Sequence, residues 1–246
     1  MIGRITAALL VFVFSSPSAA EPTKIAVAAN FAKTAEALVQ SFNDANTGSI
    51  ELVIGSTGAL YLQITQGAPV EALLAADSVR PKRLEAEGLT IKGSRFTYAL
   101  GRLVLFTRNN TKPNNLTLRS ASFERLAIAN PSTAPYGSAA IEAISALGVM
   151  PNLSDKLVRG KSVTQAFQFA WSGTAEYALV SEAQALLSTE GNFWRLPQSL
   201  YKPITQDAVL IANASPTAIA FLNFLKSPKA QSIISRRGYD LETERP

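Results

Sequence analysis

Neither cysteine nor histidine occurs among the 246 residues of this chain. Without cysteine the chain can form no disulfide, offers no thiolate nucleophile or cysteine ligand for zinc, and has no cysteine to carry a lipid anchor. Without histidine it lacks the usual base of a Ser-His-Asp triad and the imidazole ligands of metal sites. Together the two absences argue against most hydrolases and metalloenzymes.

Long apolar segments are scarce as well. The stretch MIGRITAALLVFVFSSPSAAEP has a basic start at Arg4, an apolar run over residues 5–14, and small residues at Ser18 and Ala20. This order is typical of a secretory signal peptide over residues 1–20, cleaved near Ala20. The run is too short for a permanent anchor, and no later segment reaches the roughly 18 apolar residues of a membrane span. We therefore expect an exported, freely diffusing periplasmic monomer without stable membrane insertion.

Neither sign of charge dominates. Removing the signal peptide takes away only Arg4 and leaves 22 basic residues against 18 acidic ones, a net charge of +4. The basic clusters, RPKR at 80–83 and SRRG near the end, have no aromatic residues between them, so we expect no nucleic-acid partner. A weak positive field would help to capture small anions, although an ordinary polar surface explains the same charge.

The remaining sequence alternates strand-like and helix-like segments, which predicts an α/β fold with parallel strands. The first half contains three such units, each an apolar strand followed by an amphipathic segment with a helix start or stop signal. The expected strands are 24–29, 50–54 and 70–77, and the expected helices are 31–48, 56–67 and 78–88.

A β-rich run of about twice the ordinary strand length departs from this rhythm at 94–110, where it is broken by Gly101. A second extended segment, 201–213, lies near the other end of the chain. We interpret the two as hinge strands that join two lobes. Lobe 1 is predicted to comprise 21–102 and 205–246, and lobe 2 to comprise 103–204.

Lobe 2 is expected to contain a strand at 124–130, a helix from Tyr136 to Leu147 and a short helix near 153–158. A further helix at 163–173 and a strand at 176–180 complete it. Two helices that each begin with Ser-Pro, after residues 215 and 227, return to complete lobe 1.

Ligands of open α/β sheets bind beyond the carboxyl ends of the strands, where helix N-termini converge. Four such junctions in this sequence are uncharged apart from one lysine and rich in hydrogen-bond donors. Their free first-turn amides and partial positive charges can hold a dianion without arginine or lysine. The alternative is that these residues only cap helices. The junctions are AAN with Ala29 and Asn30, GSTG with Ser56 and Thr57, APYG with Tyr136, and GKSV with Ser162 and Val163.

Enzymatic alternatives are weaker. A Ser-Lys dyad would need Ser162 and its neighbour Lys161, whose side chains point apart at a helix start. Glu85 and Glu87 are better interpreted as the solvated face of a helix than as a pair of catalytic carboxylates.

Several segments resemble the periplasmic molybdate-binding proteins of ABC importers, within the class of two-lobed solute-binding proteins. They are AVAANF, GSTGALYLQITQGAPVEALLAAD, GSRFTYALGRLVLF, IANPSTAPYGSAA, SVTQAF and SPKAQSIISRRGY. The resemblance covers nearly the whole mature chain. It implies a type II periplasmic-binding-protein fold with mixed sheets, helices on both faces and two hinge strands. It also implies capture of molybdate or tungstate as the oxyanion, without a cofactor or a directly bound metal, and delivery to the membrane permease of an ABC importer.

Carried over residue by residue, the resemblance places Asn30 at the first oxyanion position and Thr57 at the second, where family members commonly have serine. Tyr136 and Val163 would contribute from the other lobe, Val163 through its backbone amide. Ala29 and Ser56 are expected as further neighbours of the ligand.

One branch of the family has a tyrosine where this chain has Ser181. The chain instead resembles the branch whose tyrosine comes from the PYG loop, which favours Tyr136 as a site residue over Ser181. A binding protein of the same fold for another oxyanion, such as sulfate, remains open, as do an exported Ser-dependent hydrolase and a sensory rather than a transport role. A carboxylate ligand is disfavoured because no junction carries arginine.

Overall fold

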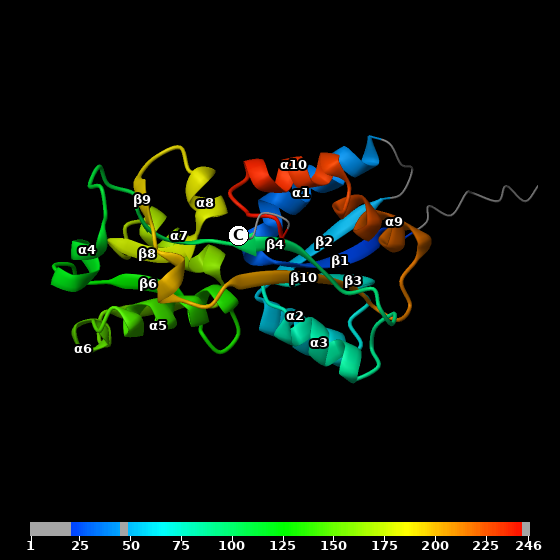
Figure 1. Ribbon diagram of the computed structural model, residues 1–246, viewed down its shortest axis with the longest axis horizontal. Helices are drawn as coiled ribbons and strands as arrows, with labels where there is room; N and C mark the ends of the chain where they lie inside the picture. Colours follow the sequence, from blue (N-terminus) through cyan, green and yellow to red (C-terminus); the bar gives the residue numbers. More distant parts are fainter. Residues whose placement is uncertain (1–20, 45–48, 243–246) are drawn as a thin grey trace, which may run out of the picture.

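The computed structural model describes residues 21–44 and 49–242. The expected signal peptide, residues 1–20, lies outside the described residues. The chain forms two lobes, each built around a five-stranded sheet flanked by helices (Figure 1). No helix within the described ranges has the length and apolar character needed to cross a membrane.

The sheet of lobe 1 has the strand order β2-β1-β3-β10-β4. Strand β1 pairs in parallel with β2 and β3, whereas β10 pairs antiparallel with β3 and β4, so the sheet is mixed. The strands are β1 (Thr23–Ala28), β2 (Ile50–Gly55), β3 (Ala72–Leu74), β4 (Phe96–Gly101) and β10 (Ile204–Leu210). The helices of lobe 1 are η1 (Ala29–Phe31), α1 (Ala32–Asn43), α2 (Thr57–Thr65), α3 (Val79–Ala86), α9 (Pro216–Leu225) and α10 (Pro228–Arg236).

Helices cover both faces of this sheet. Alternate residues of a strand point to opposite faces, so each strand contributes side chains to both cores. Ile25 and Val27 of β1 belong to a core shared with α1, α9 and α10, and Ala26 between them belongs to a core shared with α2 and α3. In Figure 1, α2 and α3 lie below the sheet, while α1, α9 and α10 lie above it.

The sheet of lobe 2 has the order β7-β6-β8-β5-β9 and is also mixed. All four residues of the interior strand β6 are buried, as expected for a strand covered on both faces. The strands are β5 (Leu103–Thr107), β6 (Leu126–Ala129), β7 (Leu157–Gly160), β8 (Tyr177–Ser181) and β9 (Asn192–Arg195). The helices are α4 (Asn115–Ser120), α5 (Pro135–Ala146), α6 (Met150–Leu153), α7 (Val163–Trp171), α8 (Glu182–Leu186) and η2 (Gln198–Leu200).

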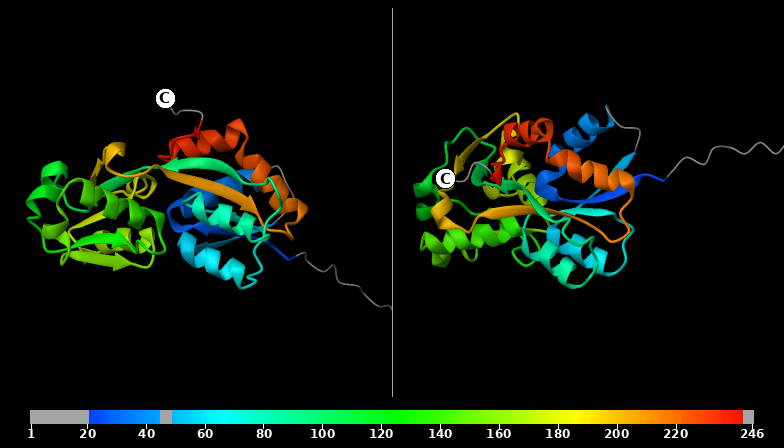
Figure 2. Two further views of the ribbon diagram at one scale, coloured as in Figure 1. Left: turned by 60° about the horizontal axis from the view of Figure 1, so that its bottom comes forward. Right: turned by 45° about the vertical axis from the view of Figure 1, so that its right-hand side comes forward.

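Two segments cross between the lobes, as the left view of Figure 2 shows. The first is the junction of β4 and β5, where Gly101 ends one strand and Leu103 begins the next. The second leads from lobe 2 into β10 at Ile204. The lobe boundaries expected after residues 102 and 204 stay a prediction.

The structure differs from the sequence-based expectations in its shortest elements. The helix expected near 153–158 is instead the end of α6 followed by the edge strand β7, and the strand expected over 70–77 pairs only at 72–74. The short elements α4, α8 and β9 were not expected at all. Edge strands and single-turn helices bury few side chains, so they leave a weak periodic signal in the sequence.

Candidate functional site

One small cavity lies between the lobes, where the N-termini of η1, α2, α5 and α7 come together. The volume of this cavity is about 10 Å³, far below the roughly 300–1,000 Å³ of pockets for drug-sized ligands. A cavity of this size excludes drug-sized ligands. Its lining residues are Ala28, Ala29, Asn30, Ser56, Thr57, Ala76, Ala134, Pro135, Tyr136 and Val163.

All six residues predicted for the site line this cavity. Ala29, Asn30, Ser56 and Thr57 come from lobe 1, and the other two come from lobe 2. Ser181 does not line it. The Ser181 hydroxyl lies 2.9 Å from Gln184 Oε1, and its oxygen accepts the Gln184 amide at the start of α8.

Helix α2 begins at Thr57, after Ser56 in an extended conformation. The Thr57 hydroxyl oxygen accepts a hydrogen bond from the buried Ala76 amide at 3.0 Å. Since that bond uses the oxygen as acceptor, the hydroxyl proton is left to donate toward the cavity. The Ser56 hydroxyl makes no cap hydrogen bond to α2, and the first-turn amide of Thr57 has no partner within the helix by helix geometry.

Helix α5 begins at Pro135, whose fixed φ and missing N–H suit the first helical position. The Tyr136 amide follows in the first turn and has no acceptor within the described ranges. Gly137 is required next, because a Cβ at this position would collide with the Ala129 carbonyl at the end of β6. This close approach of helix to strand places the α5 N-terminus at the cavity.

Helix α7 begins at Val163 after Ser162, whose hydroxyl oxygen accepts the Gln165 amide at 3.3 Å. The Val163 amide is therefore left in the first turn, as expected from the sequence. The Lys161 backbone amide donates to Gln165 Oε1 at 2.6 Å, so Ser162 and Lys161 both help to fix the start of α7.

Two side chains of the predicted site lie against residues of lobe 1. Asn30 Nδ2 donates to Gln206 Oε1 at 2.9 Å and to the Tyr239 hydroxyl at 3.2 Å, both within lobe 1. The Tyr136 hydroxyl lies beside Gly101, where a Cβ would collide with it. At both positions the backbone amide is thus the candidate donor.

The cavity has no charged lining residue, and its favourable potential for an anion comes from helix N-termini, each equivalent to roughly half a positive charge. The described residues also contain no group of three or more acidic side chains that could hold a metal ion. Burial raises the pKa of Tyr136 well above its ordinary value, so this hydroxyl stays protonated and neutral.

Direct contacts join the lobes around the cavity. The Gly58 amide donates to the Thr133 carbonyl at 2.8 Å, and the Thr164 hydroxyl donates to the Ala29 carbonyl at 3.2 Å. Arg80, which is paired with Asp77, donates to the Ser132 carbonyl at 3.1 Å. The lobes therefore meet in a closed arrangement with the cavity between them.

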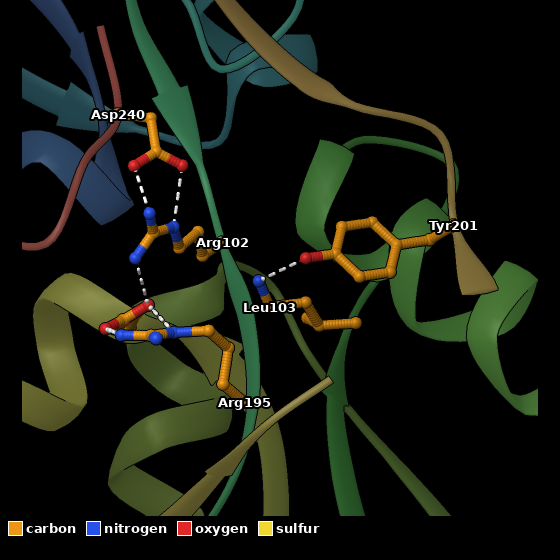
Figure 3. Close-up of polar contacts among 6 residues, drawn as sticks. Arg102, Leu103, Arg195, Tyr201 and Asp240 are labelled. Atoms are coloured by element: carbon orange, nitrogen blue, oxygen red, sulfur yellow. Dashed lines mark hydrogen bonds and ion pairs between the residues drawn. The ribbon is translucent and has the colours of Figure 1, made fainter. Parts of the chain in front are cut away.

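Ionic contacts reinforce the hinge on the side of the C-terminal segment (Figure 3). Arg102, at the crossing between β4 and β5, pairs with Asp240 of lobe 1 and lies 3.8 Å from Glu182 of lobe 2. Glu182 is also paired with Arg195. Beside this cluster, the Leu103 amide donates to the Tyr201 hydroxyl at 3.0 Å.

Sequence reasoning missed the residues that support the site from behind, above all Gln206 and Tyr239. Tyr239 donates its hydroxyl proton to the Asn30 carbonyl at 2.7 Å. Both residues are far from the four junctions in sequence, so no local pattern could have indicated them. Two lobes that close over an uncharged cavity at strand ends define this chain as a two-lobed solute-binding protein.

The comparisons with known proteins agree with that class. The chain belongs to the family of bacterial extracellular solute-binding proteins, whose profile matches residues 23–240. It is 42% identical over 240 residues to the molybdate-binding protein ModA of Rhodobacter capsulatus, covering 96% of this chain and 95% of that protein. It is 39% identical over 251 residues to ModA of Azotobacter vinelandii, covering 98% of each.

A solved structure confirms the expected fold. The periplasmic molybdate-binding protein of Azotobacter vinelandii superposes with a TM-score of 0.85 at 35% identity, covering 89% of this chain and 99% of that one. The two-lobed arrangement with mixed sheets is therefore that of the solute-binding proteins.

Proposed function

We propose that this chain is the periplasmic binding component of a molybdate ABC importer, which captures molybdate, and tungstate as its close analogue, without catalysis. Relatives at 42% and 39% identity over nearly the full length are named molybdate-binding proteins. The observation that carries the proposal is the meeting of four helix N-termini from both lobes at one small uncharged cavity.

The proposed ligand contacts are uncharged donors. Lobe 1 contributes the hydroxyls of Ser56 and Thr57 and the first-turn amides at Asn30 and Thr57, with Ala29 as a packing neighbour. Lobe 2 contributes the amides of Tyr136 and Val163. A buried dianion is costly unless its oxygens are hydrogen-bonded, so both lobes are needed to complete the site.

Donor chemistry also gives a basis for selectivity. Phosphate keeps a proton near neutral pH and needs an acceptor for it, whereas molybdate, tungstate and sulfate are fully deprotonated and only accept. A cavity lined by donors therefore disfavours phosphate. Discrimination against sulfate depends on the size of the closed cavity, because the oxygens of sulfate lie closer to its central atom.

The proposal includes further properties of the chain. It is exported with cleavage near Ala20, acts as a monomer, needs no cofactor, binds no nucleic acid, and delivers its ligand to a membrane permease. The closed arrangement of the lobes is the form that the permease would recognise, with β4, β5 and β10 bending at the hinge between the open and closed forms.

A melting-temperature panel tests the proposal with molybdate, tungstate, sulfate, phosphate and vanadate. A ligand that binds only the folded protein raises its stability by about 2.7 kcal/mol at 100 times its Kd. We expect molybdate and tungstate to raise the melting temperature at concentrations at which sulfate and phosphate do not. A larger shift with sulfate would make this a sulfate-binding protein, and no shift with any anion would refute the function.

A further inference from the structure

Gln206 lies behind the cavity on the hinge strand β10 and is fully buried. The pairing of β10 with β4 shifts register between Gln206 and Asp207, and the extra residue on β4 is Tyr98. Bulges of this kind re-aim side chains and are frequent next to binding sites. Here the Tyr98 hydroxyl lies 3.1 Å from Gln206 Oε1.

The orientation of the Gln206 amide follows from its neighbours. Tyr239 donates its proton to the Asn30 backbone carbonyl, so the Asn30 side chain must face Tyr239 with its NH2 group. The same NH2 group then donates to Gln206, which must present its oxygen. The Gln206 NH2 group therefore points the other way, and it has no hydrogen-bond partner among the described residues.

A second buried polar atom without a partner lies at the same spot. The Tyr136 hydroxyl of lobe 2 is buried and unpartnered within the described ranges. A Cβ at Gly101 would collide with this hydroxyl and lie 2.9 Å from Gln206 Nε2, so both atoms face the bare Cα of Gly101. Leaving two complementary buried groups unpaired is costly, and natural proteins seldom do so without a reason.

We propose that Gln206 is a positioning residue that fixes the lobe 1 half and the lobe 2 half of the ligand cavity relative to each other. Its carbonyl oxygen holds Asn30 of lobe 1, and its NH2 group pairs with the Tyr136 hydroxyl of lobe 2 when the ligand is bound. The inference rests on the proposed oxyanion-binding function. Tyr136 then acts twice, through its amide at the cavity and through its hydroxyl at the hinge.

The pairing can form only in the closed protein, because Tyr136 and Gln206 belong to different lobes. It should therefore lower the rate constant of ligand dissociation and leave the rate constant of ligand association unchanged. The absence of a side chain at Gly101 is what lets the Tyr136 hydroxyl approach, so the three positions form one unit.

The test is a double-mutant cycle with sodium molybdate, using Tyr136→Phe, Gln206→Met and the double variant. Calorimetry gives the Kd and stopped-flow fluorescence gives the rates. We expect Tyr136→Phe to raise the Kd about 3- to 10-fold, entirely through faster dissociation. Gln206→Met should raise it at least as much, and the double variant should match Gln206→Met within about twofold. Tyr177→Phe, a buried tyrosine in the core of lobe 2, should bind as the wild type does.

Effects that multiply in the double variant, or an unchanged dissociation rate in Tyr136→Phe, overturn the inference. If Gln206→Met does not fold, Gly101→Ala replaces it, because its methyl group collides with the Tyr136 hydroxyl at the meeting point. In that background Tyr136→Phe should no longer raise the Kd. Failure of the wild-type protein to bind molybdate overturns the proposed function, and this inference with it. Binding by the wild type with independent effects of the variants overturns the inference alone.

Discussion

The Thr57 hydroxyl accepts a hydrogen bond in the free protein and is the proposed donor to the oxyanion. Replacing it with a methyl group of similar size in Thr57→Val should remove both roles. Without ligand, the oxygen is the acceptor for the Ala76 amide, and both residues are almost fully buried. Loss of the acceptor leaves a buried N–H unpaired, which costs about 1–3 kcal/mol. For a protein of this size each 1 kcal/mol lowers the melting temperature by roughly 2–4 °C.

With ligand, the hydroxyl proton is the proposed donor to the oxyanion. A hydrogen bond to a charged partner contributes about 1.5–3 kcal/mol, so the Kd for molybdate should rise roughly 10- to 150-fold. The remaining affinity would come from the helix N-terminal amides, which the substitution leaves in place. Thr57→Ser keeps the hydroxyl and loses one methyl group, so it should bind like the wild type with a stability loss of about 1 kcal/mol.

Urea unfolding without ligand measures the first role, and titration calorimetry with sodium molybdate measures the second. If Thr57→Val binds molybdate as tightly as the wild type does, the hydroxyl makes no contact with the anion and the lobe 1 half of the site is misassigned. If Thr57→Ser loses affinity as Thr57→Val does, the effect comes from packing and not from the hydroxyl.

Three further predictions concern closure, pH and the hinge. In Gly58→Ala the new Cβ would lie 2.9 Å from the Thr133 carbonyl oxygen across the cleft. The Kd for molybdate in calorimetry should therefore rise at least about tenfold, while the free protein keeps its melting temperature. Unchanged affinity would contradict the closed arrangement. Burial raises the pKa of Tyr136 above that of the unfolded chain, so this tyrosine should leave the unfolding free energy unchanged below about pH 10 and lower it above that pH. Urea unfolding at several pH values measures this. Arg102→Met removes the ion-pair partner of Asp240. The unfolding free energy measured in urea should fall by about 1 kcal/mol at low salt and by less at high salt. A loss that does not depend on salt would argue against an ionic contribution.

Much of the fold could be predicted because its signals are local. The Ser-Pro starts of α9 and α10 are where the sequence indicated them, since capping depends on neighbours along the chain, and α5 begins at Pro135, one residue before the expected Tyr136. The break at Gly101 separates β4 from β5, and this confirms the expected split of the long β-rich run.

The site could be predicted only in part, because its supporting contacts join distant positions. Asn30 is held by Gln206 and Tyr239, which follow it by 176 and 209 residues. Sequence reasoning therefore placed Asn30 at the cavity but could not indicate that its side chain is held inside lobe 1. The direction of the Tyr136 hydroxyl depends on Gly101 in the same way.

The strand order of the two sheets has a consequence for the order of assembly during synthesis. All strands of the second sheet lie between Leu103 and Arg195, so this sheet can be completed as soon as that stretch of chain is available. In the first sheet β4 is joined to its neighbours only through β10, which ends at Leu210. A chain that emerges from its N-terminus can therefore complete its second sheet before its first, in which β4 finds its partner only when β10 arrives.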